Sequence, residues 1–375
     1  MAKARTYLDW NASAPLRPEA RAAMLQAMDV VGNPSSVHAE GRAARAIVEK
    51  ARAQVAGFAD CDEDEVVFTS GATEACSTVL AQPWARVVAH DGLHDAVVNA
   101  LPPQAERTPF ALPIQDDVAC EAFEREGLGR DASANLCVGQ GACGETGVLP
   151  THDDANDALA REMGWSVFSD ETQKAARAHF GFRPASGGGT AFACLSSHKL
   201  QGPKGVGALF VQSGRDIAPL IYGGGQEKRR RSGTESLVAI AGFGAACAQA
   251  LSDDWTSVEK LRNILESRLS EAAPDLIIVG KDALRLPNTS CFAVPGWKGE
   301  TQVMQMDLAG FAISAGSACA SGKVGPSRVL KAMGFDDVAA QSAIRVSLGP
   351  TTTAAEVHAF AAAWIESYRR IAAKR

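Results

Sequence analysis

Residues 66–74 read Val-Val-Phe-Thr-Ser-Gly-Ala-Thr-Glu, a short apolar run followed by a glycine and a hydroxyl residue. This pattern predicts a strand that ends in a glycine turn, with a helix starting directly after it. The free N–H groups and the dipole of a helix N-terminus can bind an anion. An ordinary helix cap is the alternative, because Ser and Thr are common at caps. The stretch therefore predicts a strand–turn–helix unit with a candidate anion site.

Similar short, apolar runs recur along the first 250 or so residues and alternate with longer segments of helical period. The predicted strands are Val66–Ser70, Arg86–His90, Asn135–Gly139, Ser166–Asp170, Phe192–Ser196 and Gly207–Val211. A helix is predicted over Arg42–Phe58, where apolar residues recur on one face. This alternation favours an α/β fold in which helices cover a mostly parallel sheet.

The pattern changes after Asp254. The predicted elements are the helix Val258–Ala272, the strands Leu276–Val279 and Thr289–Val294, the helix Thr301–Leu308, and a final helix Ala354–Ile371. The final helix places Val357, Phe360 and Trp364 on one stripe. These elements predict a second, smaller α+β domain.

Composition and charge exclude several classes of protein. The 375 residues are 46% apolar and 21% charged, which excludes a disordered chain, and the net charge of −6 gives no electrostatic footprint for nucleic acid. Residues 1–10 lack the apolar segment of a signal peptide, and the apolar stretch Val238–Leu251 is too short to span a bilayer. We therefore expect a cytoplasmic protein without a membrane partner.

Cysteine and histidine spacing argues against a bound metal. The nine cysteines are an odd number without a C-x-x-C motif, so neither a disulfide framework nor a structural zinc site is indicated. His90 and His94 are four residues apart, but Asp91-Gly92 breaks a helix between them and no third ligand is near. We expect no metal site.

Two residues at predicted strand ends could carry chemistry. Asp170 closes an apolar strand, where open α/β sheets bind ligands, and a helix N-cap is its alternative role. Lys199 lies in the Ser196-Ser197-His198-Lys199 run. A lysine shielded from water can lose its proton and attack a carbonyl, so Lys199 is a Schiff-base candidate, and a surface lysine is the alternative.

Two loops are also candidates. The basic run Lys228–Arg231 is flanked by glycines and suits phosphate or carboxylate binding, with a nuclear signal, a nucleic-acid site or a solvated loop as alternatives. Cys319 lies among the small residues of 315–322. An exposed thiol there can form a thiolate and reach a substrate, although a tolerated loop cysteine is the alternative.

A series of motifs occurs in a characteristic order along nearly the whole chain. They are Tyr7-Leu8-Asp9 with Asn11-Ala12, Gly32-Asn33-Pro34-Ser35-Ser36, residues 68–74, Glu145-Thr146-Gly147, Asp170 with Thr172-Gln173, Ser196 with His198-Lys199, residues 202–205, Arg231-Ser232-Gly233-Thr234, Gly316-Ser317-Ala318-Cys319, and residues 345–349. The chain resembles the NifS/IscS-type cysteine desulfurases of the class V aminotransferase superfamily, which are fold-type I pyridoxal phosphate (PLP) enzymes. Each motif alone is weak, but their combined order is specific.

The resemblance implies the domain organisation. It places a large PLP-binding domain, with a mostly parallel seven-stranded sheet, in residues 15–253. It places a small domain in residues 1–14 and 254–375, which also carry the catalytic cysteine loop. It further implies a homodimer with its active sites at the interface.

The resemblance also implies roles for site residues. Lys199 would bind PLP covalently, Asp170 would pair with the pyridine nitrogen, His94 would stack on the ring and help in proton transfer, and Gln173 would approach the phenolic oxygen. The remaining cofactor contacts would be Ala72, Thr73, Ser196 and His198, with Thr234 supplied by a second subunit. The substrate-binding residues would be Asn33, Arg231 and Arg345, of which Arg345 clamps the substrate carboxylate.

The implied reaction converts L-cysteine to L-alanine and leaves the sulfur on Cys319 as a persulfide. That sulfur would pass to a sulfur-acceptor or iron–sulfur scaffold protein. The Gly-Ser-Ala-Cys context resembles the IscS/NifS group more than the SufS-like group, which implies direct delivery.

Two departures from the family pattern leave alternatives open. Cys143-Gly144 replaces the usual Asn-Asn pair, and because a thiol is a weak donor, Gln173 would bear more of the contact with the phenolic oxygen. Residues 13–15 read Ser-Ala-Pro in place of Thr-Thr-Pro. The alternatives are a selenocysteine lyase, another class V PLP lyase, or a weakly active sulfur-relay subunit whose basic C-terminal end docks an acidic partner.

Overall fold

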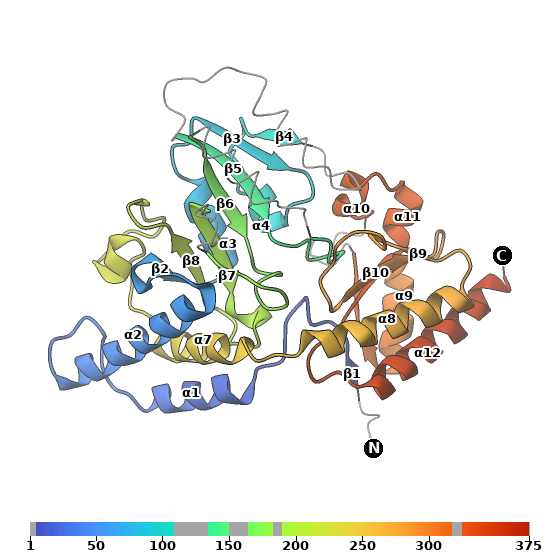
Figure 1. Cartoon of the computed structure of the whole chain (residues 1–375), viewed down its shortest axis with the longest axis horizontal. Helices are drawn as coiled ribbons and strands as arrows, with labels where there is room; N and C mark the ends of the chain where they lie inside the picture. Colours follow the sequence, from blue (N-terminus) through green and yellow to red (C-terminus); the bar gives the residue numbers. More distant parts are fainter. Residues whose placement is uncertain (1–4, 109–133, 150–163, 183–189, 317–324, 375) are drawn as a thin grey trace.

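A seven-stranded sheet forms the centre of the larger part of the molecule, in the order β2-β8-β7-β6-β5-β3-β4 (Figure 1). The computed structural model describes residues 5–108, 134–149, 164–182, 190–316 and 325–374. The strands are β2 (Val66–Thr69), β3 (Arg86–His90), β4 (Glu106–Thr108), β5 (Asn135–Gln140), β6 (Ser166–Asp170), β7 (Phe192–Ser196) and β8 (Gly207–Val211). Only β8 is antiparallel to its neighbours, which confirms the predicted mostly parallel α/β sheet.

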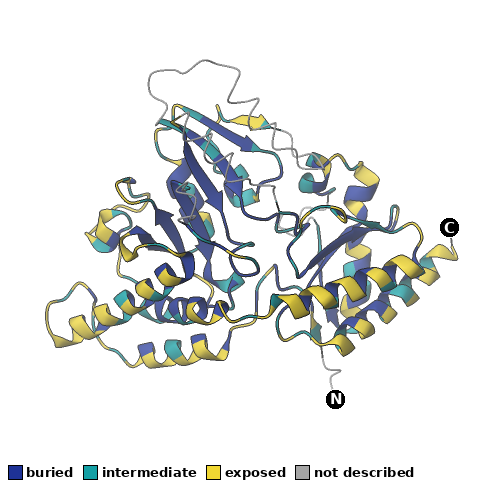
Figure 2. Ribbon diagram, in the orientation of Figure 1, coloured by how far each residue is buried: buried dark blue, intermediate teal, exposed yellow. Residues whose placement is uncertain are grey.

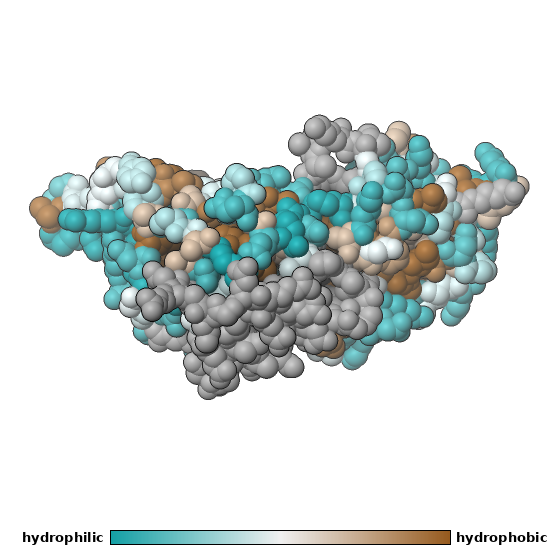
Figure 3. All heavy atoms as spheres, turned by 90° about the horizontal axis from the view of Figure 1, so that it is seen from above, coloured by the Kyte–Doolittle hydropathy of each residue, from teal (hydrophilic) through white to brown (hydrophobic). Residues whose placement is uncertain are grey.

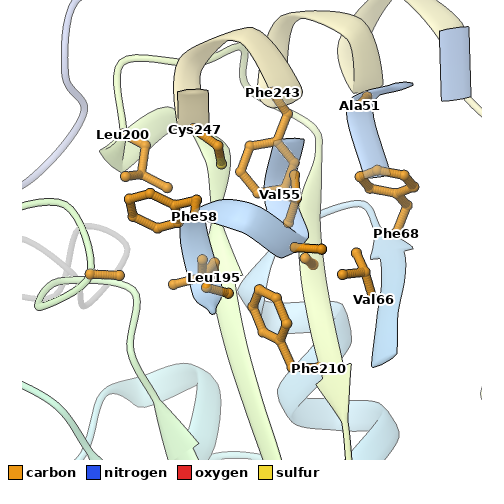
Figure 4. Close-up of a cluster of buried hydrophobic side chains, with 14 of the residues drawn as sticks. Ala51, Val55, Phe58, Val66, Phe68, Leu195, Leu200, Phe210, Phe243 and Cys247 are labelled. Carbon is orange, nitrogen blue, oxygen red and sulfur yellow. The ribbon is translucent and has the colours of Figure 1, made fainter. Parts of the chain in front are cut away.

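Strict alternation along the strands explains why helices cover both faces of this sheet. Leu195 and Phe210 point to one face, where they pack beneath α2 (Ala39–Ala59) and α7 (Leu237–Ala250) (Figure 4). Cys194 and Leu209 point to the other face, towards α3 (Ala72–Leu80) and α4 (Asp95–Val98). A further helix, α1 (Pro18–Met28), packs against α7.

The C-terminal part contains a four-stranded antiparallel sheet in the order β12-β13-β10-β9. Its elements are α8 (Trp255–Ala272), β9 (Ile277–Ile278), β10 (Thr289–Ala293), α9 (Gly299–Ala309), β11 (Phe311–Ala312), β12 (Ser314–Ala315), α10 (Arg328–Ala332), α11 (Asp337–Ser342), β13 (Ala343–Ser347) and α12 (Ala354–Ala372). The predicted stripe of α12 is buried, with Trp364 5.6 Å from Phe292 between ring centroids. Yellow outer faces on α8 and α12 in Figure 2 mark their exposed sides.

The N-terminal segment packs with this C-terminal part. Strand β1 (Thr6–Tyr7) pairs in parallel with β11, and Leu8 is fully buried in the same apolar cluster as Phe292. The division into residues 15–253 and residues 1–14 with 254–375 stays a prediction, which this packing supports.

The surface mixes polar and apolar side chains. Figure 3 shows hydrophilic and hydrophobic residues interspersed over the described part of one face. Within the described ranges, no helix combines the length and apolarity that crossing a membrane requires.

Candidate active site

The candidate site lies where the parallel strands end. Asp170 is the last residue of β6, Ser196 is the last of β7, and Gln140 at the end of β5 is in register with Asp170. A carboxylate at the end of a buried strand is placed by the sheet itself, because carboxyl ends of neighbouring parallel strands share one edge. This edge gathers Asp170, Ser196 and the residues that directly follow them.

The Asp170 carboxylate is buried and held from one side. Its Oδ1 accepts hydrogen bonds from the Thr172 backbone N–H at 3.0 Å and from Cys194 Sγ at 3.5 Å. Its Oδ2 has no hydrogen-bond partner among the residues that the structure describes. One oxygen is therefore fixed by the protein, and the other remains available to a cationic group. The Thr172 contact is also the local turn that the N-cap alternative predicts.

Lys199 and Gln173 meet at one backbone carbonyl. Lys199 lies in the short 3₁₀ helix η3 (Ser197–Lys199), and its Nζ donates to Asn11 O at 2.5 Å and to Ala12 O at 2.9 Å. Gln173 Nε2 donates to the same Asn11 oxygen at 3.1 Å. The amine and the amide predicted to face a cofactor therefore lie side by side, and Asp170 is three residues from Gln173.

The N-terminus of α3 lies beside Ser196. A Cβ built on Gly71 would be 3.7 Å from Ser196 Oγ, and one built on Gly207 would be 2.8 Å from Gly71 Cα. No side chain caps α3, so the first N–H groups, those of Ala72 and Thr73, lack the ordinary cap that was the alternative. This geometry suits a phosphate group.

His198 is uncharged near neutral pH. Its pKa is lowered to about 4, mainly because the ring is buried and secondarily because Lys199 and Lys204 are close. Its Nδ1 is 3.3 Å from Ser13 Oγ. A neutral imidazole here can share a hydrogen bond with a phosphate or a hydroxyl without adding charge.

His94 caps α4, which follows β3. Its Nδ1 accepts from the Ala96 N–H at 3.1 Å, and the residue is exposed. Arg328 of α10 fixes this turn, because its guanidinium donates to Leu93 O at 2.6 Å, to Asp95 Oδ1 at 2.9 Å and to Asp91 O. The predicted stacking of His94 on the cofactor ring stays a prediction.

Arg345 of β13 is held by two acceptors. One terminal nitrogen pairs with Asp9 Oδ1 at 2.9 Å, and the other donates to Gly144 O at 2.9 Å. Asn11 Nδ2 donates to the same Gly144 oxygen at 3.2 Å. The residue is buried, so its guanidinium is fixed in direction and its charge is balanced by Asp9.

The other residues predicted to bind the substrate or the phosphate contact fewer of the predicted site residues. Arg231 pairs with Glu74 at 3.0 Å, next to Thr73 at the start of α3. Thr234 and Asn33 are exposed, and in the described chain neither contacts another predicted site residue. Within the basic run, Lys228 pairs with Asp64 and Arg230 with Asp216, and both of these carboxylates are exposed, so the solvated-loop alternative stays open.

Cys319 lies outside the described residues, but a buried carboxylate contacts both described flanks of that segment. Glu145 hydrogen-bonds Ser327, and a Cβ on Gly316 would be 2.2 Å from Glu145 Oε1. Glu145 is partly exposed as a residue, but its Oε1 atom is buried and has no hydrogen-bond partner among the described residues. Burial raises the pKa of Glu145 to about 7, against the lowering effect of Ser327, Arg345 and Arg328.

Sequence reasoning missed three of these residues as parts of the site. Asp9 and Asn11 belong to the N-terminal motif, and Asn11 hydrogen-bonds residues of both parts of the molecule. Glu145 belongs to the Glu-Thr-Gly motif. The motifs were the available signal, because neither charge patterning nor strand ends mark these positions.

Comparison with known proteins identifies this architecture. The family model described as "Aminotransferase class-V" matches residues 6–109 and 140–360. The chain therefore belongs to the class V aminotransferase family, whose members use PLP, and the predicted cofactor and fold are confirmed.

Within that family the chain belongs to the NifS/IscS-type cysteine desulfurases, as predicted. A cysteine desulfurase of Cereibacter sphaeroides is 39% identical over 94% of this chain and 93% of its own length. One from a Frankia strain is 37% identical over 94% of this chain and 88% of its own length. A NifS-like protein structure from Rickettsia africae has a TM-score of 0.86 at 29% identity, covering 97% of this chain and 99% of that one.

Proposed function

We propose that the protein is a PLP-dependent cysteine desulfurase that converts L-cysteine to L-alanine and transfers the sulfur to Cys319. The observation that carries this proposal is that Lys199 and Gln173 both donate hydrogen bonds to Asn11 O. Gln173 is three residues from Asp170, whose carboxylate accepts hydrogen bonds through one oxygen, Oδ1. An amine, an amide and a buried carboxylate at one sheet edge are the groups that a pyridine aldehyde cofactor requires.

The side chains present fit PLP. The open Oδ2 of Asp170 suits a protonated ring nitrogen, and the uncapped start of α3 beside Ser196 suits the phosphate. Lys199 would hold the aldehyde carbon. When bound, PLP withdraws electrons from the α-carbon of the attached amino acid.

The chain's own residues account for the remaining chemistry. Arg345 orients the substrate carboxylate, and Lys199 takes the proton from the α-carbon. The Cys319 thiolate then attacks the substrate sulfur, so that an S–S bond forms as the C–S bond breaks. The electron pair of that C–S bond stays on carbon, which takes up a proton and leaves as alanine. The exchange is balanced without an external oxidant or reductant.

The proposal includes a homodimer in which Thr234 completes the phosphate site of the other subunit. The exposure of Thr234 supports this, together with its lack of contact with other predicted site residues in the described chain. The sulfur on Cys319 would then pass to a sulfur-acceptor or iron–sulfur scaffold protein in the cytoplasm.

The test is to incubate the purified protein with PLP, L-cysteine and a thiol reductant, and to measure alanine and sulfide. We expect both products from the native chain and from Cys61→Ala, a control outside the site, but neither from Cys319→Ala. Lys199→Ala should lose the visible absorbance of covalently bound PLP. Alanine formation from selenocysteine that persists in Cys319→Ala would favour the lyase alternative. A protein that binds PLP but forms no alanine from either substrate would refute the enzyme proposal.

A further inference from the structure

Two buried thiols lie behind Asp170. Cys194, on β7, has its Sγ 3.5 Å from Asp170 Oδ1, and Cys76, on α3, has its Sγ 3.8 Å from Cys194 Sγ. Both cysteines are fully buried and free, and they lie on the α3 face of the sheet. The proposed reaction does not use them. Among the described residues, the Cys194 thiol is the side chain that hydrogen-bonds the Asp170 carboxylate, and Cys76 contacts that thiol from behind.

The direction of the hydrogen bond follows from the environment. A thiolate at Cys194 would place a second negative charge beside Asp170 in a buried site. Burial, reinforced by Cys76 and Asp170, holds the pKa of the Cys194 thiol well above its ordinary value. Cys194 therefore keeps its proton, and its S–H donates to Asp170 Oδ1.

We propose that Cys194 is a positioning residue that orients Asp170 towards the cofactor, with Cys76 packed behind it. This inference rests on the proposed function, in which Asp170 Oδ2 faces the ring nitrogen of PLP. Two donors on Oδ1, the Thr172 N–H and the Cys194 thiol, fix the rotation of the carboxylate about its Cβ–Cγ bond. A thiol is a weak donor, so it directs the carboxylate while leaving most of its negative charge for the ring.

A metal site is the competing interpretation of the same atoms. Ligand atoms of Cys76, Asp170 and Cys194 lie within 4.8 Å of one another. However, metal binding requires both thiols to lose their protons, which the burial of Cys194 opposes, and structural zinc normally takes four ligands. The hydrogen-bonded arrangement satisfies the described groups without these costs.

The test compares Cys194→Ala and Cys194→Ser with Cys247→Ala in the full-length holoenzyme. Cys247 is equally buried but lies on α7, in the cluster on the opposite face of the sheet. The readouts are the dissociation constant for PLP, the visible absorbance of the bound cofactor, and the unfolding midpoint. Loss of one hydrogen bond predicts roughly three- to tenfold weaker PLP binding and a shifted absorbance band in Cys194→Ala.

The conservative variant and the control make the outcome decisive. Cys194→Ser keeps a donor, so its PLP affinity should stay within about twofold of the native value. Cys247→Ala should lower the unfolding midpoint without changing the absorbance band. If Cys194→Ala and Cys247→Ala change PLP affinity and absorbance equally, Cys194 is only a packing residue and the inference fails. Thiolate–metal absorbance on adding Cd²⁺ to the holoenzyme, absent in Cys194→Ala, would also overturn it.

Failure of this inference differs from failure of the proposed function. A native protein that releases alanine and binds PLP, with unaltered cofactor absorbance in Cys194→Ala, leaves the enzyme proposal intact and removes the positioning role. A native protein that forms no alanine fails the earlier proposal, whatever the thiol variants show.

Discussion

Replacing Glu145 with glutamine should remove a large pH dependence from the stability of the protein. Glu145 faces Arg345 on β13, Arg328 on α10, Asp95 on α4 and the Ser327 hydroxyl. The thiol of Cys143, two residues earlier, is also buried, and burial raises its pKa. Burial dominates these influences and raises the pKa of Glu145 from 4.5 to about 7.

The sign of the effect follows from proton linkage. The folded protein binds the Glu145 proton more tightly than the unfolded chain, so this group contributes stability at low pH that is lost as pH rises towards about 7. The gap from 4.5 to about 7 corresponds to about 3 kcal/mol in total. Between about pH 5 and about pH 8, roughly 2.5 kcal/mol of that difference should be expressed.

Urea denaturation of both proteins at these two pH values measures the effect. Glutamine keeps the shape but cannot ionise, so the native protein should lose about 2.5 kcal/mol more than Glu145→Gln on going from the lower pH to the higher. Glu366→Gln, on the exposed side of α12, is the control and should behave like the native protein. Equal pH dependence in the native protein and Glu145→Gln would show that the carboxyl is not the buried proton-holding group inferred from its geometry.

Three further predictions concern groups around the sheet. Arg52 and Glu227 form a buried pair at 2.7 Å, so Arg52→Met should cost about 3–5 kcal/mol in urea denaturation, and a cost within error of an exposed substitution would contradict that. Gly207→Ala would place a Cβ 2.8 Å from Gly71 Cα, so we expect the free energy of unfolding to fall by about 1–3 kcal/mol and PLP to bind more weakly in an equilibrium titration. Unchanged PLP affinity would argue against a phosphate site at the start of α3. With a pKa of about 4, His198 stays neutral between about pH 5.5 and about pH 8, so the pH dependence of PLP affinity in this range should be the same for the native protein and His198→Gln. A change in affinity that only the native protein shows would mean that the ring titrates in this range.

The elements that the sequence predicts well are those with a strong apolar pattern. Strands such as Ser166–Asp170 and Phe192–Ser196 have the predicted bounds, because every residue in them is buried. The edge strand Glu106–Thr108 has no apolar run, since it is short and largely exposed, and it was not predicted. Its place in the sheet depends on pairing with β3, which is a tertiary contact.

The same distinction applies to the site. Asp170 and Lys199 could be selected because Asp170 ends a predicted strand and Lys199 closely follows another, and ligands bind at strand ends in such folds. Glu145 and Cys194 gain their importance from burial and from neighbours far away in the sequence, such as Ser327 and Asp170. Spacing along the chain does not carry that information.

The N-terminal segment has a consequence for the order in which the enzyme matures on the ribosome. Asn11 and Ala12 supply the oxygens that hold the Lys199 amine, and this segment is held in part by residues that are synthesised much later than Lys199. The Leu8 N–H donates to Ala312 O at 2.9 Å, and the Asn11 N–H donates to Ser347 Oγ at 3.0 Å. The large sheet can form while translation continues, but the environment of Lys199 is completed only when strand β13 has emerged. A nascent chain stalled before that strand would carry the lysine without its finished surroundings, so we expect cofactor loading to follow the emergence of β13.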